Sequence, residues 1–161
     1  MVLPGLVTLQ PYHLQEILEL ESHIQQYSKN EIDPVSKREI LRQFLDWAGQ
    51  GQCISQGLED ADGKLIAYFF LLMDPELIQT FFNPKETDLK RCAYLAQIVV
   101  KPGSQSAGIG SKLMDLIEES ARNAGKDKLL LEVHSQAKAF RWYQHRNYQE
   151  ICSQVFMSKK L

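Results

Sequence analysis

Apolar and polar residues along this chain follow two different periods, one typical of strands and one typical of helices. Apolar runs of strand length occupy residues 7–9, 53–58, 65–73, 95–100 and 128–134. Apolar residues three and four positions apart, as on one face of a helix, mark residues 14–24, 37–48, 109–124 and 137–146. A last strand region runs from Tyr148 to Leu161. We therefore predict the order β-α-α-β-β-β-α-β-α-β and a single mixed α/β domain over residues 1–161.

Local signals predict where these elements begin, end and pair. Ser36 and Glu39 have the spacing of a capping box at the start of the second helix. Asp62-Gly63 lies between two apolar runs, which predicts an antiparallel hairpin. Gly125 is placed to end the preceding helix in a left-handed conformation. The apolar run 128–134 follows that helix, so we expect a buried strand parallel to 95–100. For residues 75–91 the pattern does not decide between helix and strand.

Length and charge narrow the possible partners. A chain of 161 residues with 44% hydrophobic residues is long enough for one domain with a core. Its 18 Lys and Arg and 20 Asp and Glu give a net charge of −2, so no basic field favours nucleic acid or an anionic membrane. The longest apolar run is too short to span a bilayer, and the first residues do not resemble a secretory leader. We expect a cytoplasmic protein whose partners are small or locally recognised.

The cysteines and histidines lack the spacings of a metal site. The cysteines are odd in number and far apart, without a Cys-x-x-Cys pair: Cys53, Cys92 and Cys152. We expect them to be reduced and mostly buried, with a catalytic thiol as the alternative. The histidines have neither His-x-x-x-His nor glutamate-flanked metal spacing: His13, His23, His134 and His145. The sequence therefore predicts no metal.

The turn after residues 95–100 carries the most specific chemistry. Gly108 and Gly110 lack side chains where a helix begins, so the first free N–H groups of that helix can bind one phosphate. A P-loop is excluded because Ile109 occupies the place of its lysine. A dinucleotide fingerprint is excluded because Leu113 stands where a third small residue is required. Close packing alone is the alternative role of the two glycines.

The remaining pattern is Gln-x-x-Gly-x-Gly, beginning at Gln105, directly after a Val-x-Pro strand end at Val100. It resembles the acyl-CoA motif, Arg/Gln-x-x-Gly-x-Gly/Ala, of the GNAT superfamily of N-acyltransferases, and the resemblance covers nearly the whole chain. It implies an α/β (α+β) fold with a mixed, mostly antiparallel sheet, a central splayed pair of parallel strands and helices on both faces. It also implies acetyl-CoA as co-substrate.

The resemblance further implies which residues hold acetyl-CoA. They are Ile98, Val99, Val100, Gln105, Ala107, Gly108, Ile109, Gly110, Ser111, Lys112 and Gln136. The backbone of Ile98 and Val100 would pair with pantetheine, and an N–H near Val99 or Val100 would polarise the thioester carbonyl. The turn and the helix start would bind the pyrophosphate, with Lys112 adding charge outside. For Ser111 and Lys112, a polar first helical turn is the alternative.

A second segment supports the resemblance. Four residues stand where the family often has a small-apolar-Tyr-x-x-x-Gly-Phe segment: Ala139, Trp142, Tyr143 and Tyr148. The chain departs from the family at Gln136, which replaces the usual Asn and displaces its amide by one methylene. It departs also at Asn147, which replaces Gly but tolerates a left-handed conformation, and at Tyr148, which replaces Phe.

Acetyl transfer to an amine requires a base for the amine and an acid for the leaving thiolate. Tyr143 matches the family tyrosine that reaches the thioester sulfur, and a core tyrosine is its alternative role. Glu132 interrupts an apolar strand, where a buried carboxylate has a raised pKa unless it is paired. Leu131-Glu132-Val133 resembles the ribosomal-protein alanine N-acetyltransferase branch, which uses a glutamate there as base. A strand-end carboxylate bound by backbone N–H groups is the structural alternative, and His134 is the rival base.

We predict transfer of an acetyl group from acetyl-CoA to a primary amine by direct attack. The segments around Glu132 and Tyr143 favour a protein or peptide N-terminal α-amine. The short tail after Tyr148 favours the alternative acceptor, a small amine such as a polyamine. A CoA-binding module without turnover is a further alternative. Residues 27–35 are a candidate acceptor loop or a plain connector, and a short terminal strand open to a partner's edge leaves a homodimer possible.

Overall fold

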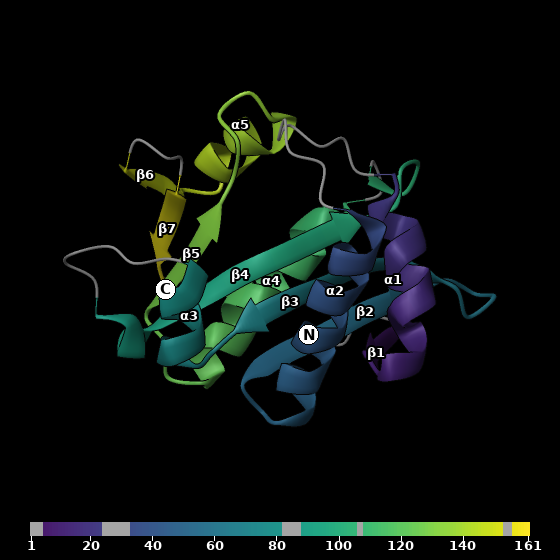
Figure 1. Ribbon diagram of the computed structural model, residues 1–161. Helices are drawn as coiled ribbons and strands as arrows, with labels where there is room; N and C mark the ends of the chain where they lie inside the picture. Colours follow the sequence, from purple (N-terminus) through teal and green to yellow (C-terminus); the bar gives the residue numbers. More distant parts are fainter. Residues whose placement is uncertain (1–4, 24–32, 82–87, 106–107, 153–155) are drawn as a thin grey trace.

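The computed structural model describes residues 5–23, 33–81, 88–105, 108–152 and 156–161. Its strands form one seven-stranded sheet in the order β1-β2-β3-β4-β5-β7-β6 (Figure 1). They are β1 (Leu6–Thr8), β2 (Cys53–Glu59), β3 (Leu65–Leu72), β4 (Cys92–Val100), β5 (Lys128–Glu132), β6 (Gln149–Cys152) and β7 (Phe156–Lys160). All neighbours pair antiparallel except β4 and β5, which are parallel. The expected mixed, mostly antiparallel sheet with one central parallel pair is confirmed.

Helices cover both faces of this sheet (Figure 1). They are α1 (Leu14–Glu21), α2 (Pro34–Gly49), α3 (Pro75–Phe81), α4 (Ile109–Asn123) and α5 (Lys138–His145), with 3-10 turns at Pro11–His13 and Leu89–Arg91. One core lies between the sheet and α1, α2 and α3, and the other between the sheet and α4 and α5. Because both faces are covered, β3 is apolar at nearly every position rather than at every second one. None of the described helices combines the length and the apolar character that a bilayer crossing requires.

The second helix begins earlier than the sequence predicts. Asp33, not Ser36, is its N-cap, because the Asp33 side chain accepts hydrogen bonds from the N–H groups of Val35 and Ser36. Pro34 occupies the first helical position, where its missing N–H costs nothing. The predicted Ser36–Glu39 capping box is therefore wrong, and the Ser36 hydroxyl instead donates to Asp33.

The end of the chain also differs from the prediction. Where one strand region was expected, the structure has two antiparallel strands, β6 and β7; β7 pairs with β5, which leaves β6 at the edge of the sheet. Residues 75–91 contain the helix α3 and a 3-10 turn. The hairpin at Asp62-Gly63 is confirmed. Gly125 and Asn147 adopt the expected left-handed conformation, with φ of 75° and 65°.

Candidate active site

The central parallel strands pair over only part of their length. Cys92–Leu95 of β4 pair with Lys128–Leu131 of β5. Beyond Leu95, β4 stays paired with β3 as far as Val100, while β5 ends at Glu132. A bulge falls where the strands separate, since Leu71 pairs with Leu95 and Phe70 with Gln97, leaving Ala96 between them. A bulge bends its strand, so β4 diverges from β5 here, as the splayed pair implied.

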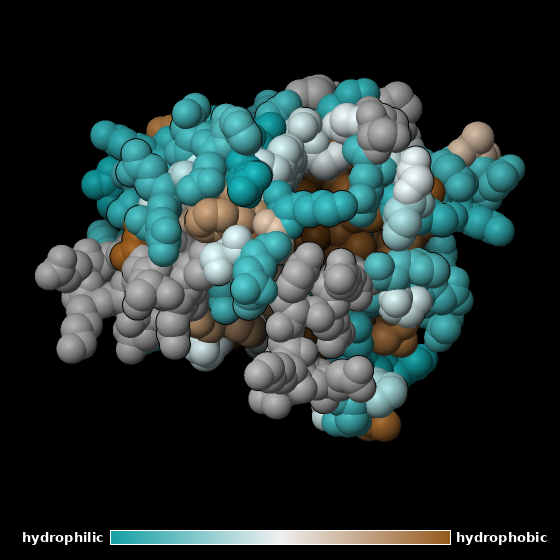
Figure 2. All heavy atoms as spheres, turned by 90° about the horizontal axis from the view of Figure 1, so that it is seen from above, coloured by the Kyte–Doolittle hydropathy of each residue, from teal (hydrophilic) through white to brown (hydrophobic). Residues whose placement is uncertain are grey.

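A cavity of about 810 Å³ lies at this divergence. Leu20 lines it from α1, on one face of the sheet, together with His23 just after that helix, and Gly110 and Tyr143 line it from α4 and α5, on the other face. The cavity therefore passes between the strands and opens toward both faces. Figure 2 looks down on this end of the molecule and shows a hollow with a hydrophobic floor and a hydrophilic rim.

The backbone of β4 presents hydrogen-bonding groups to the cavity. The Lys101 N–H donates to the Ile66 carbonyl of β3 at 2.8 Å. Because facing residues in an antiparallel pair alternate between bonded and unbonded, Val99 also bonds to β3, whereas Ile98 and Val100 direct their N–H and C=O toward the cavity. The Gln105 side chain confirms this direction, since its Nε2 donates to the Val100 carbonyl at 3.2 Å. Of the N–H groups of Val99 and Val100, that of Val100 is therefore the one directed toward the cavity.

The start of α4 faces the same cavity. Gly108 precedes it with a φ of 72°, and the first helical bond runs from the Lys112 N–H to the Gly108 carbonyl at 3.1 Å. The N–H groups of Ile109, Gly110 and Ser111 come before this first bond of the helix. The first turn has no acidic side chain. A Cβ at Gly110 would lie 3.8 Å from Trp142 and 3.9 Å from Val100, so its absence keeps a cradle open between them. The N–H groups at this helix start, the positive end of the helix dipole and the open space beside Gly110 fit a pyrophosphate.

The other predicted cofactor residues divide into two groups. Those that line the cavity are Ile98, Val99, Val100, Gln105, Gly108, Gly110 and Ser111. Among the described residues, Ile109, Lys112 and Gln136 do not line it, and the side chains of Lys112 and Gln136 are exposed. The Gln136 N–H donates to Nδ1 of His134 at 3.2 Å, which places Gln136 in a turn before α5. Ala107 and most of the predicted acceptor loop lie outside the described residues.

Glu132 is the last residue of β5 and lines the cavity. Successive side chains of a strand point to opposite faces, so Glu132 points to the same face as Leu130 and away from Leu129 and Leu131. That face is the one covered by α1, α2 and α3. The expectation of a buried carboxylate is wrong, because the side chain is exposed where the strands separate. Burial raises the pKa of the Tyr94 phenol, and the negative charge of Glu132 raises it further.

Tyr143 lines the cavity from the opposite face, on α5. Its side chain is 5% exposed, and its ring packs edge-on against Tyr148 at 5.4 Å between centroids. Burial raises the pKa of its phenol, against the smaller opposing effect of the Arg146 charge. Within the part of the chain that the structure describes, its hydroxyl makes no hydrogen bond. Tyr143 therefore keeps its proton at neutral pH and has a donor to offer a ligand.

His134, the rival base, is not among the described residues that line the cavity, and it contacts the turn through its Nδ1. Several lining residues were not predicted as site residues from the sequence, among them Leu20, His23 and Gln97. Leu20 lies on α1 and His23 just after it, both far from the other lining residues in the chain, and no local motif marks them. Gln97 is fixed by the buried Glu21, whose Oε1 accepts from its Nε2 at 2.6 Å. No cluster of three or more potential metal ligands occurs in the described ranges.

Comparison with known proteins agrees with this geometry. The sequence model of the acetyltransferase (GNAT) family matches residues 14–148. No curated protein sequence matches significantly. The fold is similar to the PaiA N-acetyltransferase from Thermoplasma acidophilum in complex with coenzyme A, at 18% identity, with 97% of this chain and 98% of that chain covered and a TM-score of 0.69.

A second similar structure is the ribosomal-protein-S18-alanine N-acetyltransferase from Escherichia coli, at 17% identity, 96% and 92% coverage and a TM-score of 0.69. A third is yncA from Salmonella typhimurium with its cofactor acetyl-CoA, at 14% identity, 97% and 92% coverage and a TM-score of 0.69. Because the family model matches most of its length, the chain belongs to the acetyltransferase (GNAT) family, and the expected acetyl-CoA-dependent N-acetyltransferase is confirmed at the level of the family.

Proposed function

We propose that this enzyme acetylates the N-terminal α-amine of a protein or peptide by direct attack, with Glu132 as the base and Tyr143 as the acid. One observation carries the proposal: both side chains line one cavity, but from opposite faces of the sheet. A base and an acid on opposite sides of the reacting carbon are what a direct transfer between two bound substrates requires.

The residues around the cavity can hold the co-substrate. Acetyl-CoA supplies the activated acetyl group as a thioester. The N–H groups at the start of α4 would bind its pyrophosphate in the cradle beside Gly110. The N–H and C=O groups of Ile98 and Val100 would pair with its pantetheine arm as a missing strand would. The Gln105 side chain would keep its hydrogen bond to the Val100 carbonyl and so hold the turn in its conformation.

Each chemical step then has a residue of suitable chemistry. The exposed carboxylate of Glu132 takes a proton from the acceptor amine through water, since an α-amine has a pKa near 8 and is mostly protonated at pH 7. The Val100 N–H stabilises negative charge on the carbonyl oxygen. Tyr143, which burial keeps protonated, donates its proton to the leaving thiolate.

The acceptor is argued from the face that Glu132 occupies. On that face the cavity is lined by Leu20, His23 and Gln97, a mixture of apolar and hydrogen-bonding groups suited to a peptide end. The fold similarity to the ribosomal-protein-S18-alanine N-acetyltransferase supports the same choice. The alternative acceptor, a small amine, is favoured by the shortness of the β6–β7 hairpin beside β5. The free thiols of Cys53 and Cys92 agree with a location in the reducing cytoplasm.

The test is release of CoA thiol by the purified protein with acetyl-CoA, across a panel of short peptides with free N-termini and a panel of small amines. We expect release with peptides, and none with the same peptides blocked at the N-terminus. Release with small amines alone would replace the peptide acceptor by the alternative. Binding of acetyl-CoA without release in either panel would favour a CoA-binding module.

A further inference from the structure

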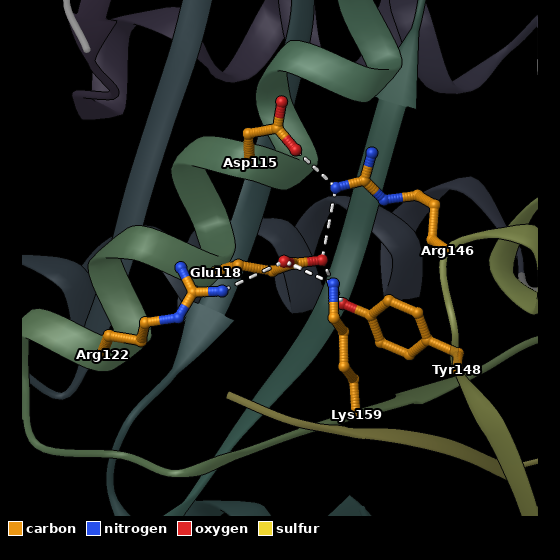
Figure 3. Close-up of polar contacts among 6 residues, drawn as sticks. All are labelled: Asp115, Glu118, Arg122, Arg146, Tyr148 and Lys159. Atoms are coloured by element: carbon orange, nitrogen blue, oxygen red, sulfur yellow. Dashed lines mark hydrogen bonds and ion pairs between the residues drawn. The ribbon is translucent and has the colours of Figure 1, made fainter.

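A buried carboxylate lies behind the wall of the active site. Glu118 on α4 is 4% exposed, and its two oxygens meet donors from the turn after α5, from β7 and from α4 itself (Figure 3). Oε1 accepts from the Tyr148 hydroxyl at 3.2 Å and from Arg146 at 3.3 Å. Oε2 accepts from Lys159 on β7 at 2.8 Å and from Arg122 at 3.4 Å. A buried carboxylate is tolerated when its oxygens are well bonded, and removal of its charge weakens the bond to the buried Tyr148 hydroxyl and the ion pairs with three partly exposed cations.

The first of these donors supports Tyr143 directly. The Tyr148 ring packs edge-on against the Tyr143 ring, 5.4 Å between centroids. The Tyr148 N–H also donates to the Tyr143 carbonyl at 3.1 Å. The hydrogen bond from the Tyr148 hydroxyl to Glu118 therefore fixes the surface on which the Tyr143 ring rests.

The second donor supports the same helix end. The Arg146 N–H donates to the Tyr143 carbonyl at 3.0 Å, and its guanidinium lies over the Trp142 ring, 5.6 Å from the ring centroid. Asp115, also on α4, holds the same guanidinium at 2.6 Å (Figure 3). Both cavity-lining aromatic residues of α5, Trp142 and Tyr143, thus pack against groups that Glu118 holds.

We propose that Glu118 is a positioning residue for the reaction: by holding Tyr148 and Arg146 it aims the Tyr143 hydroxyl into the cavity. The inference rests on the acid role of Tyr143 under the proposed function. It assigns no contact between Glu118 and either substrate, so the carboxylate acts only through Tyr143. A displaced acid lowers turnover more than it lowers binding of acetyl-CoA, since the cradle at Gly110 and the β4 backbone are unchanged.

The experiment is a double-mutant cycle between Glu118→Gln and Tyr143→Phe, with Glu119→Gln as the matched control on the next residue of α4. For Glu118→Gln we expect kcat to fall about tenfold with the KM for acetyl-CoA within about twofold of the wild type. In the Tyr143→Phe background the same change should lower kcat less than about twofold, because the group it positions is gone. Glu119→Gln should keep the wild-type kcat.

Tyr148→Phe decides the matter if Glu118→Gln does not fold, because it keeps the ring against Tyr143 and removes only the bond to Glu118. Tyr148→Phe should lower kcat when it is introduced into the wild type. It should not lower kcat further when it is introduced into Tyr143→Phe. This inference alone is overturned if the two reductions in kcat multiply in a double variant. It is also overturned if Glu118→Gln folds and has the wild-type kcat. A wild-type kcat for Tyr143→Phe overturns the acid role and this inference together.

Discussion

Gly108 and Gly110 lie two residues apart but are glycines for different physical reasons. Gly108 has a φ of 72°, a conformation that an L side chain rarely adopts, while a Cβ there would meet nothing within 4 Å. Gly110 has an ordinary helical conformation, and a Cβ there would fill the space between Trp142 and Val100. The first glycine therefore serves the turn, and the second serves the cavity.

The two alanine variants should separate these roles. Gly108→Ala should lower the free energy of unfolding by about 1–2 kcal/mol, the cost of a left-handed L residue. Gly110→Ala should leave stability unchanged or slightly raised, because alanine favours helix by about 1 kcal/mol, but should raise the Kd for acetyl-CoA at least about tenfold by filling the cradle. Urea unfolding and calorimetric titration measure both quantities. Wild-type affinity in Gly110→Ala would contradict the placement of the pyrophosphate.

Glu132 and His134 lie two residues apart at the end of β5, and only Glu132 lines the cavity among the described residues. Glu132→Gln should reduce kcat at least about a hundredfold at pH 7, because it keeps the shape and removes the base. His134→Asn should keep kcat within about threefold, since His134 is not among the described residues that line the cavity. Acetyl-CoA affinity, measured in parallel, should be unchanged in both. A larger loss in His134→Asn than in Glu132→Gln would make His134 the base.

At the scale of the element, the site depends on two strands that stop pairing. The bulge at Ala96 bends β4 just where its pairing with β5 ends. Beyond that point, Ile98 and Val100 direct their N–H and C=O groups to the side where β5 no longer pairs with β4. Val99 directs its groups to the other side, where β4 still pairs with β3. The resulting open strand edge lies inside the molecule, where an unpaired N–H is costly unless water or a ligand binds it.

This geometry predicts an alternating pattern of amide exchange along β4. The amides of Ile98 and Val100 should exchange with solvent faster than that of Val99, which bonds to β3. Acetyl-CoA should slow the exchange of Ile98 and Val100 by at least about tenfold and leave Val99 unchanged. Residue-resolved hydrogen exchange by NMR, with and without acetyl-CoA, tests both statements. Equal protection of all three amides would contradict the assigned direction of the backbone.

At the scale of the whole molecule, two cores enclose the sheet and bury several tyrosines. Burial raises the pKa of four phenols above their usual value: Tyr68, Tyr94, Tyr143 and Tyr148. It also raises the pKa of the Cys53 thiol to about 12. In each case the folded protein holds a proton that the unfolded chain releases at lower pH.

The sign of the pH dependence follows. These groups contribute full stability below their ordinary pKa, and that stability is lost as the pH rises toward the folded value. Above pH of about 10, the free energy of unfolding should fall by about 1.4 kcal/mol per pH unit for each tyrosine. Urea unfolding at several pH values from about 8 to about 11 measures the slope. Tyr68→Phe should reduce this slope by the contribution of one tyrosine, about 1.4 kcal/mol per pH unit. A free energy of unfolding that does not change with pH in the wild type would contradict the burial of these tyrosines.

Much of the fold and of the site was determined by the sequence alone. The Asp62-Gly63 hairpin, the α4 helix with the left-handed Gly125 after it, and the glycine-containing turn before α4 rest on contacts within a few residues, which local spacing reports directly. The strand expected at 128–134 was marked by its continuous apolar run, and the structure has it at Lys128–Glu132. The motif after Val100 led to the correct family for the same reason.

Only the tertiary structure decided which of these residues meet. The sequence did not predict the β6–β7 hairpin, the exposure of Glu132 or the lining of the cavity by α1. It also gave no sign that Glu118 is buried, because its partners Arg146, Tyr148 and Lys159 are between 28 and 41 residues away. Such contacts depend on how elements pack across the sheet, and no local period records that packing.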